Sequence, residues 1–267
     1  CIALVLVILV LARPQTTNKC QNSEIEGIDI MLAIDVSTSM LAEDLKPNRL
    51  EAAKDVAAEF INGRPNDNIG ITLFAGETFT QCPLTVDHAV LLDMIHNIKC
   101  GLITDGTAVG MGIANAVTRL KDSKAKSKVI ILLTDGTNNK GDISPMTAAE
   151  IAKSFGIRVY TIGVGTNGMA PYPYPVGNTV QYVSMPVEID EKTLTEIAGT
   201  TDGNYFRATS NSKLKEVYEE IDKLEKTKLN VKEYSKRDEE YHWFALAAFL
   251  CVLLEVLLRN SVLKKIP

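Results

Sequence analysis

Histidine is scarce in this chain, and the sequence has no excess of basic residues. Only three histidines occur among the 267 residues, and none lies near the motifs that are rich in hydroxyl and carboxylate groups. A nucleophile activated by histidine is therefore not visible, and we do not expect an enzyme. The net charge of −5 argues against binding to nucleic acid, because such binding requires a basic face.

Cysteine is also sparse, and its spacing does not indicate a zinc site. Cys82, His88, His96 and Cys100 follow one another closely, but residues 86–98 are predicted to be helical. Eight residues of helix span about 12 Å, which is too far for His88 and His96 to share one zinc with bonds of about 2 Å. A disulfide between Cys82 and Cys100 and a pair of buried thiols remain as alternatives.

The sequence does contain a hydrophobic fraction of 46%, which is enough for one sizeable core. Short β-branched runs alternate with amphipathic helical stretches across residues 25–225. This alternation predicts an α/β fold with a doubly wound, mainly parallel sheet and helices on both of its faces. The expected strands cover 27–36, 68–76, 78–82, 128–136, 157–165 and 203–208, and the expected helices cover 49–62, 86–98, 108–121, 146–155, 190–201 and 211–226.

An insertion at 166–190 interrupts this alternation. It is rich in proline, tyrosine and glycine, so we expect a surface loop or a hairpin rather than part of the core. A rigid loop with aromatic side chains is suited to contact a partner, because it supplies contact area at little entropic cost. A crossover loop that covers an edge of the sheet is the alternative.

Both ends of the chain are apolar. Residues 1–13 are interpreted as the C-terminal part of a transmembrane helix, because a full span needs about 20 apolar residues. The chain begins with Cys rather than Met, so we interpret it as a fragment, and a signal-peptide remnant is the alternative. Residues 241–260 are predicted to form a second transmembrane helix, bordered by Tyr241 and Trp243 at one end and by basic residues at the other. Residues 226–240 are expected to form a linker or stalk.

The quartet TDGT occurs twice, at 104–107 and at 134–137. The second copy ends a predicted buried strand, which places Asp135 at the carboxyl edge of the sheet, where doubly wound folds bind ligands. The first copy lies in a loop that opens a helix, so its useful atom is the Thr107 hydroxyl oxygen. Asp105 is interpreted as ordinary turn chemistry, because Asp-Gly favours turns.

The motif DVSTS follows the first predicted strand and contributes Asp35, Ser37 and Ser39 to the same edge. Together with Thr107 and Asp135, these residues offer two carboxylates and three hydroxyls, all of them hard oxygen donors. Such a set suits Mg²⁺, or less selectively Mn²⁺ and Ca²⁺. An Asp or Glu side chain of a partner would complete the coordination. For DVSTS alone, a capped turn without metal is the alternative.

These motifs resemble the metal-ion-dependent adhesion site of von Willebrand factor type A domains. That site consists of D-x-S-x-S, a distant threonine in a G-T-x-x-G loop and a later T-D-G, and its five positions match Asp35, Ser37, Ser39, Thr107 and Asp135 one by one. The segments GIDIMLAIDVSTSMLAEDLKPNRL, FAGETFTQCPLT and IGVGT also resemble the bacterial aerotolerance (Bat) proteins, in particular the BatA type.

The resemblance implies a membrane-anchored domain that recognises protein partners and is not an enzyme. The implied location is the bacterial inner membrane, with the domain in the periplasm. Basic residues flank the second span on both sides, so charge alone does not decide the orientation. The implied partners are other Bat-type membrane proteins and a MoxR-type AAA+ ATPase, in a complex with an assembly or chaperone-like role. A surface adhesin that binds an external ligand through the same metal is the alternative.

Overall fold

The computed structural model describes residues 15–16, 27–166, 168–176, 179–187, 189–230, 238–239, 249–250 and 253. The chain divides into two compact units, one formed by residues 24–230 and the other by residues 1–23 and 231–267. In the terminal unit, β1 (Gln15–Thr16) pairs antiparallel with β10 (Asp238–Glu239). All five predicted metal ligands lie in the unit 24–230.

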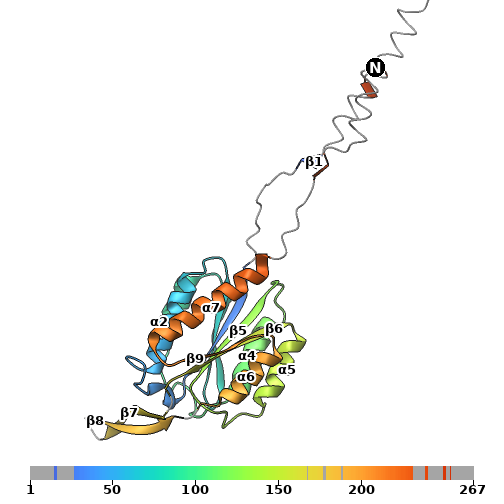
Figure 1. Ribbon diagram of the computed structural model, residues 1–267. Coiled ribbons are helices and arrows are strands. Elements are labelled where there is room, and N and C mark those ends of the chain that lie inside the picture. Colours follow the sequence, from blue (N-terminus) through green and yellow to red (C-terminus); the bar gives the residue numbers. More distant parts are fainter. Residues whose placement is uncertain are drawn as a thin grey trace, which may run out of the picture. The chain divides into compact units, whose positions relative to one another are not determined.

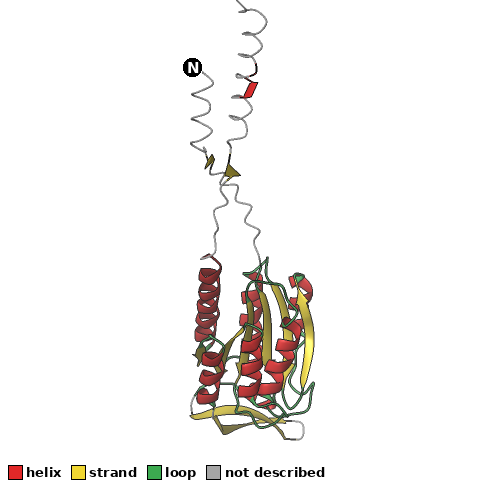
Figure 2. Cartoon of the chain, turned by 90° about the vertical axis from the view of Figure 1, so that its right-hand side faces the viewer, coloured by secondary structure: helices red, strands yellow, loops and turns green. Residues whose placement is uncertain are grey.

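A six-stranded sheet forms the centre of the unit 24–230 (Figures 1 and 2). Its strands are β2 (Asp29–Asp35), β3 (Asn68–Phe74), β4 (Thr78–Thr85), β5 (Lys128–Thr134), β6 (Ile157–Val164) and β9 (Tyr205–Ala208). They lie in the order β4-β3-β2-β5-β6-β9, and every neighbouring pair is parallel except β3 and β4. The mainly parallel sheet predicted from the sequence is therefore confirmed.

Helices cover both faces of this sheet, as predicted. They are α2 (Arg49–Asn62), α3 (His88–His96), α4 (Val109–Leu120), α5 (Pro145–Ser154), α6 (Glu191–Thr200) and α7 (Asn211–Asn230), together with the short 3-10 helix η1 (Thr38–Leu41). Alternate residues of a strand point to opposite faces. In β2, Ile30, Leu32 and Ile34 pack into the core that α2, α3 and α7 line, whereas Met31 and Ala33 pack into the core beside α4, α5 and α6.

The insertion forms a β-hairpin, which is one of the two forms expected for it. Its strands, β7 (Gly168–Val176) and β8 (Thr179–Val187), pair only with each other, in a separate two-stranded sheet. The hairpin projects at the carboxyl end of the six-stranded sheet (Figure 1). Its base is tied to the segment after η1, where the Glu43 amide donates a hydrogen bond of 2.9 Å to the Pro171 carbonyl.

The predicted spans at 1–13 and 241–260 lie outside the described residues, apart from 249–250 and 253. No helix in the described part of the chain has both the length and the apolar character needed to span a bilayer. The helix α7 continues to Asn230, so the predicted linker at 226–240 begins as helix. The two membrane anchors stay a prediction.

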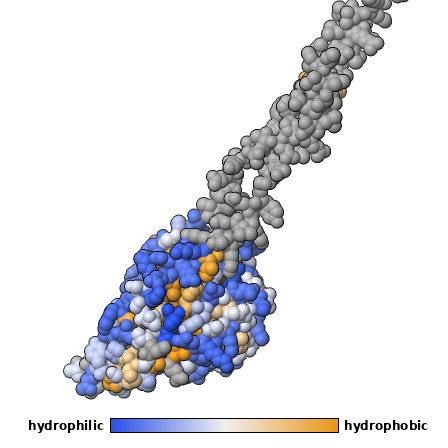
Figure 3. Space-filling model, in the orientation of Figure 1, coloured by the Kyte–Doolittle hydropathy of each residue, from blue (hydrophilic) through white to orange (hydrophobic). Residues whose placement is uncertain are grey.

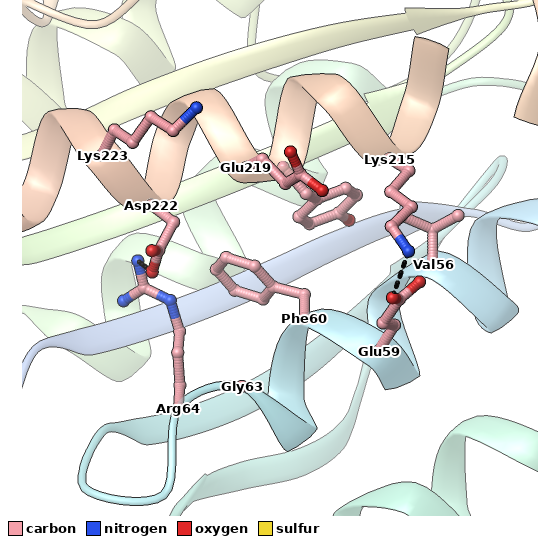
Figure 4. A pocket seen from close by; sticks show the side chains of 10 residues that line it. Val56, Glu59, Phe60, Gly63, Arg64, Lys215, Glu219, Asp222 and Lys223 are labelled. Carbon is pink, nitrogen blue, oxygen red and sulfur yellow. Dashed lines mark hydrogen bonds and ion pairs between the residues drawn. The ribbon is translucent and has the colours of Figure 1, made fainter. Parts of the chain in front are cut away.

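The last helix, α7, packs against α2 and leaves a hollow of about 320 Å³ beside the two helices (Figure 4). The ring centroids of Phe60 and Tyr218 lie 4.9 Å apart, and the Arg64 guanidinium lies 4.6 Å from the Phe60 centroid. Lys215 and Glu59 form an ion pair between the two helices. Aromatic and cation–π contacts of this kind stabilise the pairing of α7 with α2.

A second anchor of α7 is Glu225, whose exposed fraction is only 1%. Its carboxylate accepts hydrogen bonds of 2.6 Å from the Tyr160 hydroxyl and 2.8 Å from the Ser127 hydroxyl, and it pairs with the Arg158 guanidinium. Burial raises the pKa of this carboxyl group, but the bonds from Arg158 and Tyr160 outweigh burial and lower the pKa below its usual value. Charge and hydrogen bonding therefore join α7 to the strands β5 and β6.

Replacing Glu225 with Ala should destabilise the domain. Breaking a buried ion pair costs about 3–5 kcal/mol, and we expect about 3 kcal/mol, the lower end of that range, because the Arg158 side chain is 22% exposed. The free energy of unfolding would be measured by urea denaturation at neutral pH. As the control, Glu220→Ala changes an exposed position on the same helix and should leave the unfolding midpoint unchanged. Equal stability of the two variants would contradict the anchoring role.

The same carboxylate should give the stability a pH dependence. Because the pKa of Glu225 is lower in the folded state than the ordinary value of 4.5, its contribution is complete above that value and is lost as the pH falls through the folded-state pKa. Between about pH 5 and pH 3, wild-type protein should therefore lose more stability than Glu225→Gln, which has no group to titrate there. Parallel curves of unfolding free energy against pH for the two proteins would refute this assignment.

Candidate metal centre

Three loops at the carboxyl edge of the sheet bring the five predicted ligands together. Asp35 is the last residue of β2, and Asp135 follows the last residue of β5. Because β2 and β5 are neighbours in parallel register, these two aspartates leave the sheet side by side. Ser37 precedes η1 and Ser39 lies within it, directly after β2, and Thr107 lies in the loop before α4.

A chain of hydrogen bonds links four of these side chains. The hydroxyl oxygens of Ser37 and Ser39 lie 2.9 Å apart, and the Ser39 hydroxyl donates to Asp135 Oδ1 at 2.7 Å. Asp35 accepts bonds from the Ser37 amide at 2.9 Å and from the Thr134 hydroxyl at 2.6 Å. Asp35, Ser37 and Asp135 are buried, whereas Ser39 is exposed. The site therefore opens to solvent at Ser39.

The fifth residue, Thr107, is held next to Asp135 by Asn139, which lies in the loop that follows β5. The Thr107 amide donates a bond of 2.9 Å to Asn139 Oδ1, and the Thr107 carbonyl accepts a bond of 2.9 Å from the Asn139 amide. A Cβ atom at Gly136 would lie 3.3 Å from the Thr107 hydroxyl oxygen, so this hydroxyl rests against the backbone that follows Asp135. The two TDGT segments thus meet, one with Thr107 and the other with Asp135.

Asp105 does more than form a turn, so the interpretation from the sequence was incomplete. Its carboxylate accepts hydrogen bonds from the amide and the hydroxyl of Thr38, at 3.0 and 2.9 Å. The bond from the Thr38 amide is the main cause that lowers the pKa of Asp105. Because Thr38 lies 67 residues away along the chain, the sequence gives no local sign of this contact. Asp105 thereby fixes the loop that carries Ser37 and Ser39.

The cation closest to the site, Arg49, was missed from the sequence. Its side chain is 2% exposed, donates to Asp135 Oδ2 at 2.7 Å and forms two further bonds of 2.7 Å to the carboxylate of Asp44. Asp44 also accepts a bond of 2.7 Å from the Thr166 amide at the base of the hairpin. A signal was available, because Arg49 precedes the buried Ala53 by about one helical turn, on the apolar face of α2. A lone cation on such a face requires a buried anion.

Asp35 and Asp135, the two aspartates at the centre of the site, have too little positive charge nearby to balance both carboxylates. Burial and the nearby charge of Asp135 raise the pKa of Asp35 to about 7. Burial also raises the pKa of Asp135, although Arg49 opposes this effect. For Asp44, burial acts in the same sense, but the bonds from Arg49 and Thr166 outweigh it and lower the pKa to about 2. One guanidinium is therefore shared by two carboxylates, and among the residues that the structure describes no cation pairs with Asp35.

The donor set and its spacing fit a small divalent cation. Mg²⁺ binds oxygen at about 2.0–2.1 Å in an octahedron, so neighbouring oxygens lie about 2.9 Å apart. The Ser37–Ser39 separation of 2.9 Å and the Ser39–Asp135 separation of 2.7 Å are close to that spacing. Within the described residues no group of three His, Cys, Asp or Glu side chains could hold a metal, so hydroxyl oxygens have to supply part of the ligand set.

The two domain cysteines do not contribute to this ligand set. Cys82 and Cys100 are both free thiols, so the structure has the pair of thiols rather than the disulfide considered from the sequence. Cys100 lies near the site, where its thiol is 3.5 Å from the Ser37 carbonyl oxygen. Burial, together with the charges of Asp35 and Asp135, raises the pKa of Cys100 to about 12. Both thiols are soft donors, and neither is among the five predicted oxygen ligands.

The family of this chain follows from a sequence match that covers all strands of the six-stranded sheet. A family model for the von Willebrand factor type A domain matches residues 29–220, which include all five predicted ligands. The chain belongs to the von Willebrand A family. The α/β fold and the order of the motifs along the chain agree with this membership.

Solved structures of Bacteroides proteins are similar to this von Willebrand A domain. BatB of Bacteroides thetaiotaomicron is 34% identical, with a TM-score of 0.66, and the match covers 75% of this chain and 100% of that chain. An aerotolerance-related membrane protein of Bacteroides fragilis is also 34% identical, with a TM-score of 0.64 and coverage of 74% and 100%. The resemblance to Bat proteins is confirmed, and the type named among them is BatB.

More distant relatives extend the comparison. An uncharacterized protein of Borreliella burgdorferi is 27% identical over 99% of this chain and 78% of its own length. A UPF0353 protein of Mycolicibacterium paratuberculosis is 30% identical over 80% of this chain, which spans 64% of that protein. Proximal thread matrix protein 1 from the mussel byssus is 25% identical, with a TM-score of 0.59, over 74% of this chain and 45% of that chain. Its structure has a zinc-occupied MIDAS motif, the metal-ion-dependent adhesion site.

Removing the arginine should destabilise the domain and strengthen its response to cations. Arg49→Met leaves Asp44 and Asp135 buried without their cation, a change that costs about 3–5 kcal/mol in typical buried pairs. Added Mg²⁺ should then raise the unfolding temperature of Arg49→Met more than that of wild type, because Asp135 has lost its other positive partner.

The matched control is Lys54→Met. Lys54 is a buried cation on the same helix, but it bonds to Glu51 and to the Ile98 carbonyl rather than to the site. Its Mg²⁺ response, measured by scanning fluorimetry, should equal that of wild type. If Arg49→Met and Lys54→Met respond equally to Mg²⁺, Arg49 does not set the charge of the site.

Proposed function

We propose that this von Willebrand A domain binds a divalent cation and uses it to recognise a carboxylate of a partner protein. The ion would be Mg²⁺, or less selectively Mn²⁺ or Ca²⁺, held by Asp35, Ser37, Ser39, Thr107 and Asp135. When bound, it supplies a positive charge with an open position that an Asp or Glu side chain of the partner can fill.

The difference in exposure within the ligand set carries this proposal. Asp35 is 0% exposed and Asp135 is 2% exposed, so a macromolecule cannot reach either carboxylate. Ser39, in contrast, is exposed and bonds directly to Asp135. A cation held by buried carboxylates on one side and by Ser39 on the other would face the solvent. This arrangement suits recognition of another protein rather than chemistry on a bound substrate.

A relative supports the use of a metal at this motif. The mussel protein was solved with zinc in its MIDAS motif. In this chain the proposed donors are only carboxylate and hydroxyl oxygens, and such hard donors suit Mg²⁺, whereas zinc favours nitrogen and sulfur. We therefore propose Mg²⁺ as the resident ion, because the donor set contains no nitrogen or sulfur that would select zinc.

The proposed setting is a membrane complex. The similar protein of Bacteroides fragilis is an aerotolerance-related membrane protein, and the apolar runs at 1–13 and 241–260 have the composition of membrane spans. We propose that they anchor the domain at 25–225 to the periplasmic side of the bacterial inner membrane, with 226–240 as the stalk. The proposed partners are other Bat-type membrane proteins, with a MoxR-type AAA+ ATPase coupled from the cytoplasmic side, in an assembly or chaperone-like role.

Calorimetric titration of the unit 24–230 should detect one Mg²⁺ or Mn²⁺ per chain. Asp35→Asn should abolish binding, because it removes the charge of the most buried carboxylate of the set. Asp93→Asn should bind as wild type does, since it changes an exposed position on α3 and Asp93 is not a proposed ligand. Identical titrations of Asp35→Asn and wild type would rule out the site.

Capture of partners should depend on the same ion. The full chain would be purified from membranes of its native host in Mg²⁺ or in EDTA, and the co-purifying proteins would be compared. We expect EDTA to release them, Asp35→Asn to lose them and Asp93→Asn, an exposed position on α3, to retain them. If the same proteins co-purify with and without EDTA, and with wild type and Asp35→Asn, recognition does not use the metal.

A further inference from the structure

The two edges of the hairpin differ in their capacity to accept another strand. In an antiparallel pair, residues that exchange both backbone bonds with the other strand alternate with residues whose N–H and C=O point outward. The Pro171 carbonyl accepts its bond from Glu43, which lies outside the hairpin, so Pro171 points outward. By this alternation Pro173 and Pro175 point outward as well.

The register fixes which residues of β8 point outward. Pro171 pairs with Ser184 and Pro173 pairs with Tyr182, so Ser184 and Tyr182 occupy outward positions of β8. Pro186, which pairs with Met169, is the next outward position toward the end of the strand. All four prolines of the hairpin therefore lie where no N–H is needed for pairing within it.

The edge of β7 is blocked, whereas the edge of β8 is open. Proline lacks an N–H group and prevents strand addition at an edge, and it occupies three successive outward positions of β7. β8 contains no proline or lysine before Pro186. Within the described residues, no backbone hydrogen bond from another element reaches the N–H or C=O groups of Tyr182 and Ser184. These groups form a short ladder without a partner strand.

The strand β8 has no charged residue of its own and exposes several apolar side chains, although its Tyr182 hydroxyl is hydrogen-bonded to the Glu43 carboxylate. Neither β7 nor β8 contains a charged residue, although 23% of the chain is charged. Tyr182, Val183 and Met185 are exposed by 62, 47 and 46%. In Figure 3 the projecting hairpin is pale to orange, next to the bluer surface of the domain. An exposed apolar strand with a free edge is a site for strand pairing.

We propose that β8 pairs antiparallel with β8 of a second copy of this chain, so that two hairpins form one four-stranded sheet. A two-fold pairing brings each strand against its own sequence, so a charged strand would repel itself, and β8 has no charge to do so. The outward N–H positions are Val180, Tyr182 and Ser184, so the central one, Tyr182, faces its counterpart. The dimer also places two copies of the proposed metal site in one assembly, which favours a partner with two carboxylates.

The oligomeric state of the unit 24–230 tests this proposal. The unit contains the whole six-stranded sheet and both cores, and the similar BatB chain, matched over its full length, folds with the same extent. Sedimentation velocity over a concentration series in EDTA, where cation binding plays no part, should show a monomer–dimer equilibrium for wild type. A wild type that stays monomeric up to its solubility limit overturns the proposal.

Substitutions at Ser184 test whether the dimer forms through the outward edge of β8. Ser184→Pro removes one outward N–H in each copy and leaves the bonds between β7 and β8 in place, as Pro186 already does. Losing these two symmetric bonds should weaken the dimer by about tenfold or more. Ser184→Ala keeps the N–H and should dimerise as wild type does. Dimerisation that is unchanged in a folded Ser184→Pro variant overturns the assignment to this edge.

Crosslinking provides a readout that does not depend on the proline variant. Tyr182 on β8 and Tyr174 on β7 are similarly exposed, at 62 and 56%. Oxidation of Tyr182→Cys should join two copies through a disulfide, whereas Tyr174→Cys, on the blocked strand, should stay monomeric under the same conditions. Equal crosslinking of both variants contradicts pairing through β8.

Discussion

The buried guanidinium of Arg49 is the contact on which the rest of the site depends. It holds Asp135 with one nitrogen and Asp44 with two others, each at 2.7 Å. Both carboxylates are shielded from water, with side-chain exposures of 5% for Asp44 and 0% for Asp135, so each would tend to lose its charge without the arginine. Because Asp44 also binds the Thr166 amide, one cation connects the start of α2, the end of β5 and the base of the hairpin.

The net charge of these buried groups is what a bound divalent cation would neutralise. Asp35, Asp44 and Asp135 carry three negative charges when ionised, and Arg49 neutralises one of them, which leaves the charge that a divalent cation balances. The hydroxyls of Ser37 and Ser39 add neutral oxygens and do not change this balance. The charged groups of the site are buried, while Ser39 is exposed to solvent, where the proposed partner would bind.

The strands and helices could be predicted from the sequence. Buried parallel strands appear in it as continuous apolar runs, and the helices that cover the sheet appear as apolar residues at helical spacing. That the five proposed ligands lie together could be predicted from motif order, since the carboxyl ends of neighbouring strands meet at one edge. The contacts of Asp135 with Arg49 and of Asp105 with Thr38 were not predictable, because they join residues 86 and 67 positions apart and depend on packing. For the insertion, the proline content left both a loop and a hairpin open, and only the pairing register and the bond from Glu43 to Pro171 show that each proline points outward.

The central claim is that the oxygens of the two TDGT segments and of DVSTS hold one cation. Its most direct test is anomalous diffraction from crystals of the unit 24–230 grown with Mn²⁺. The account predicts a single Mn²⁺ peak within bonding distance of the Ser37 and Ser39 hydroxyl oxygens, with the Arg49–Asp135 pair retained. A peak at another place on the domain, or no peak in crystals that contain Mn²⁺, would contradict it.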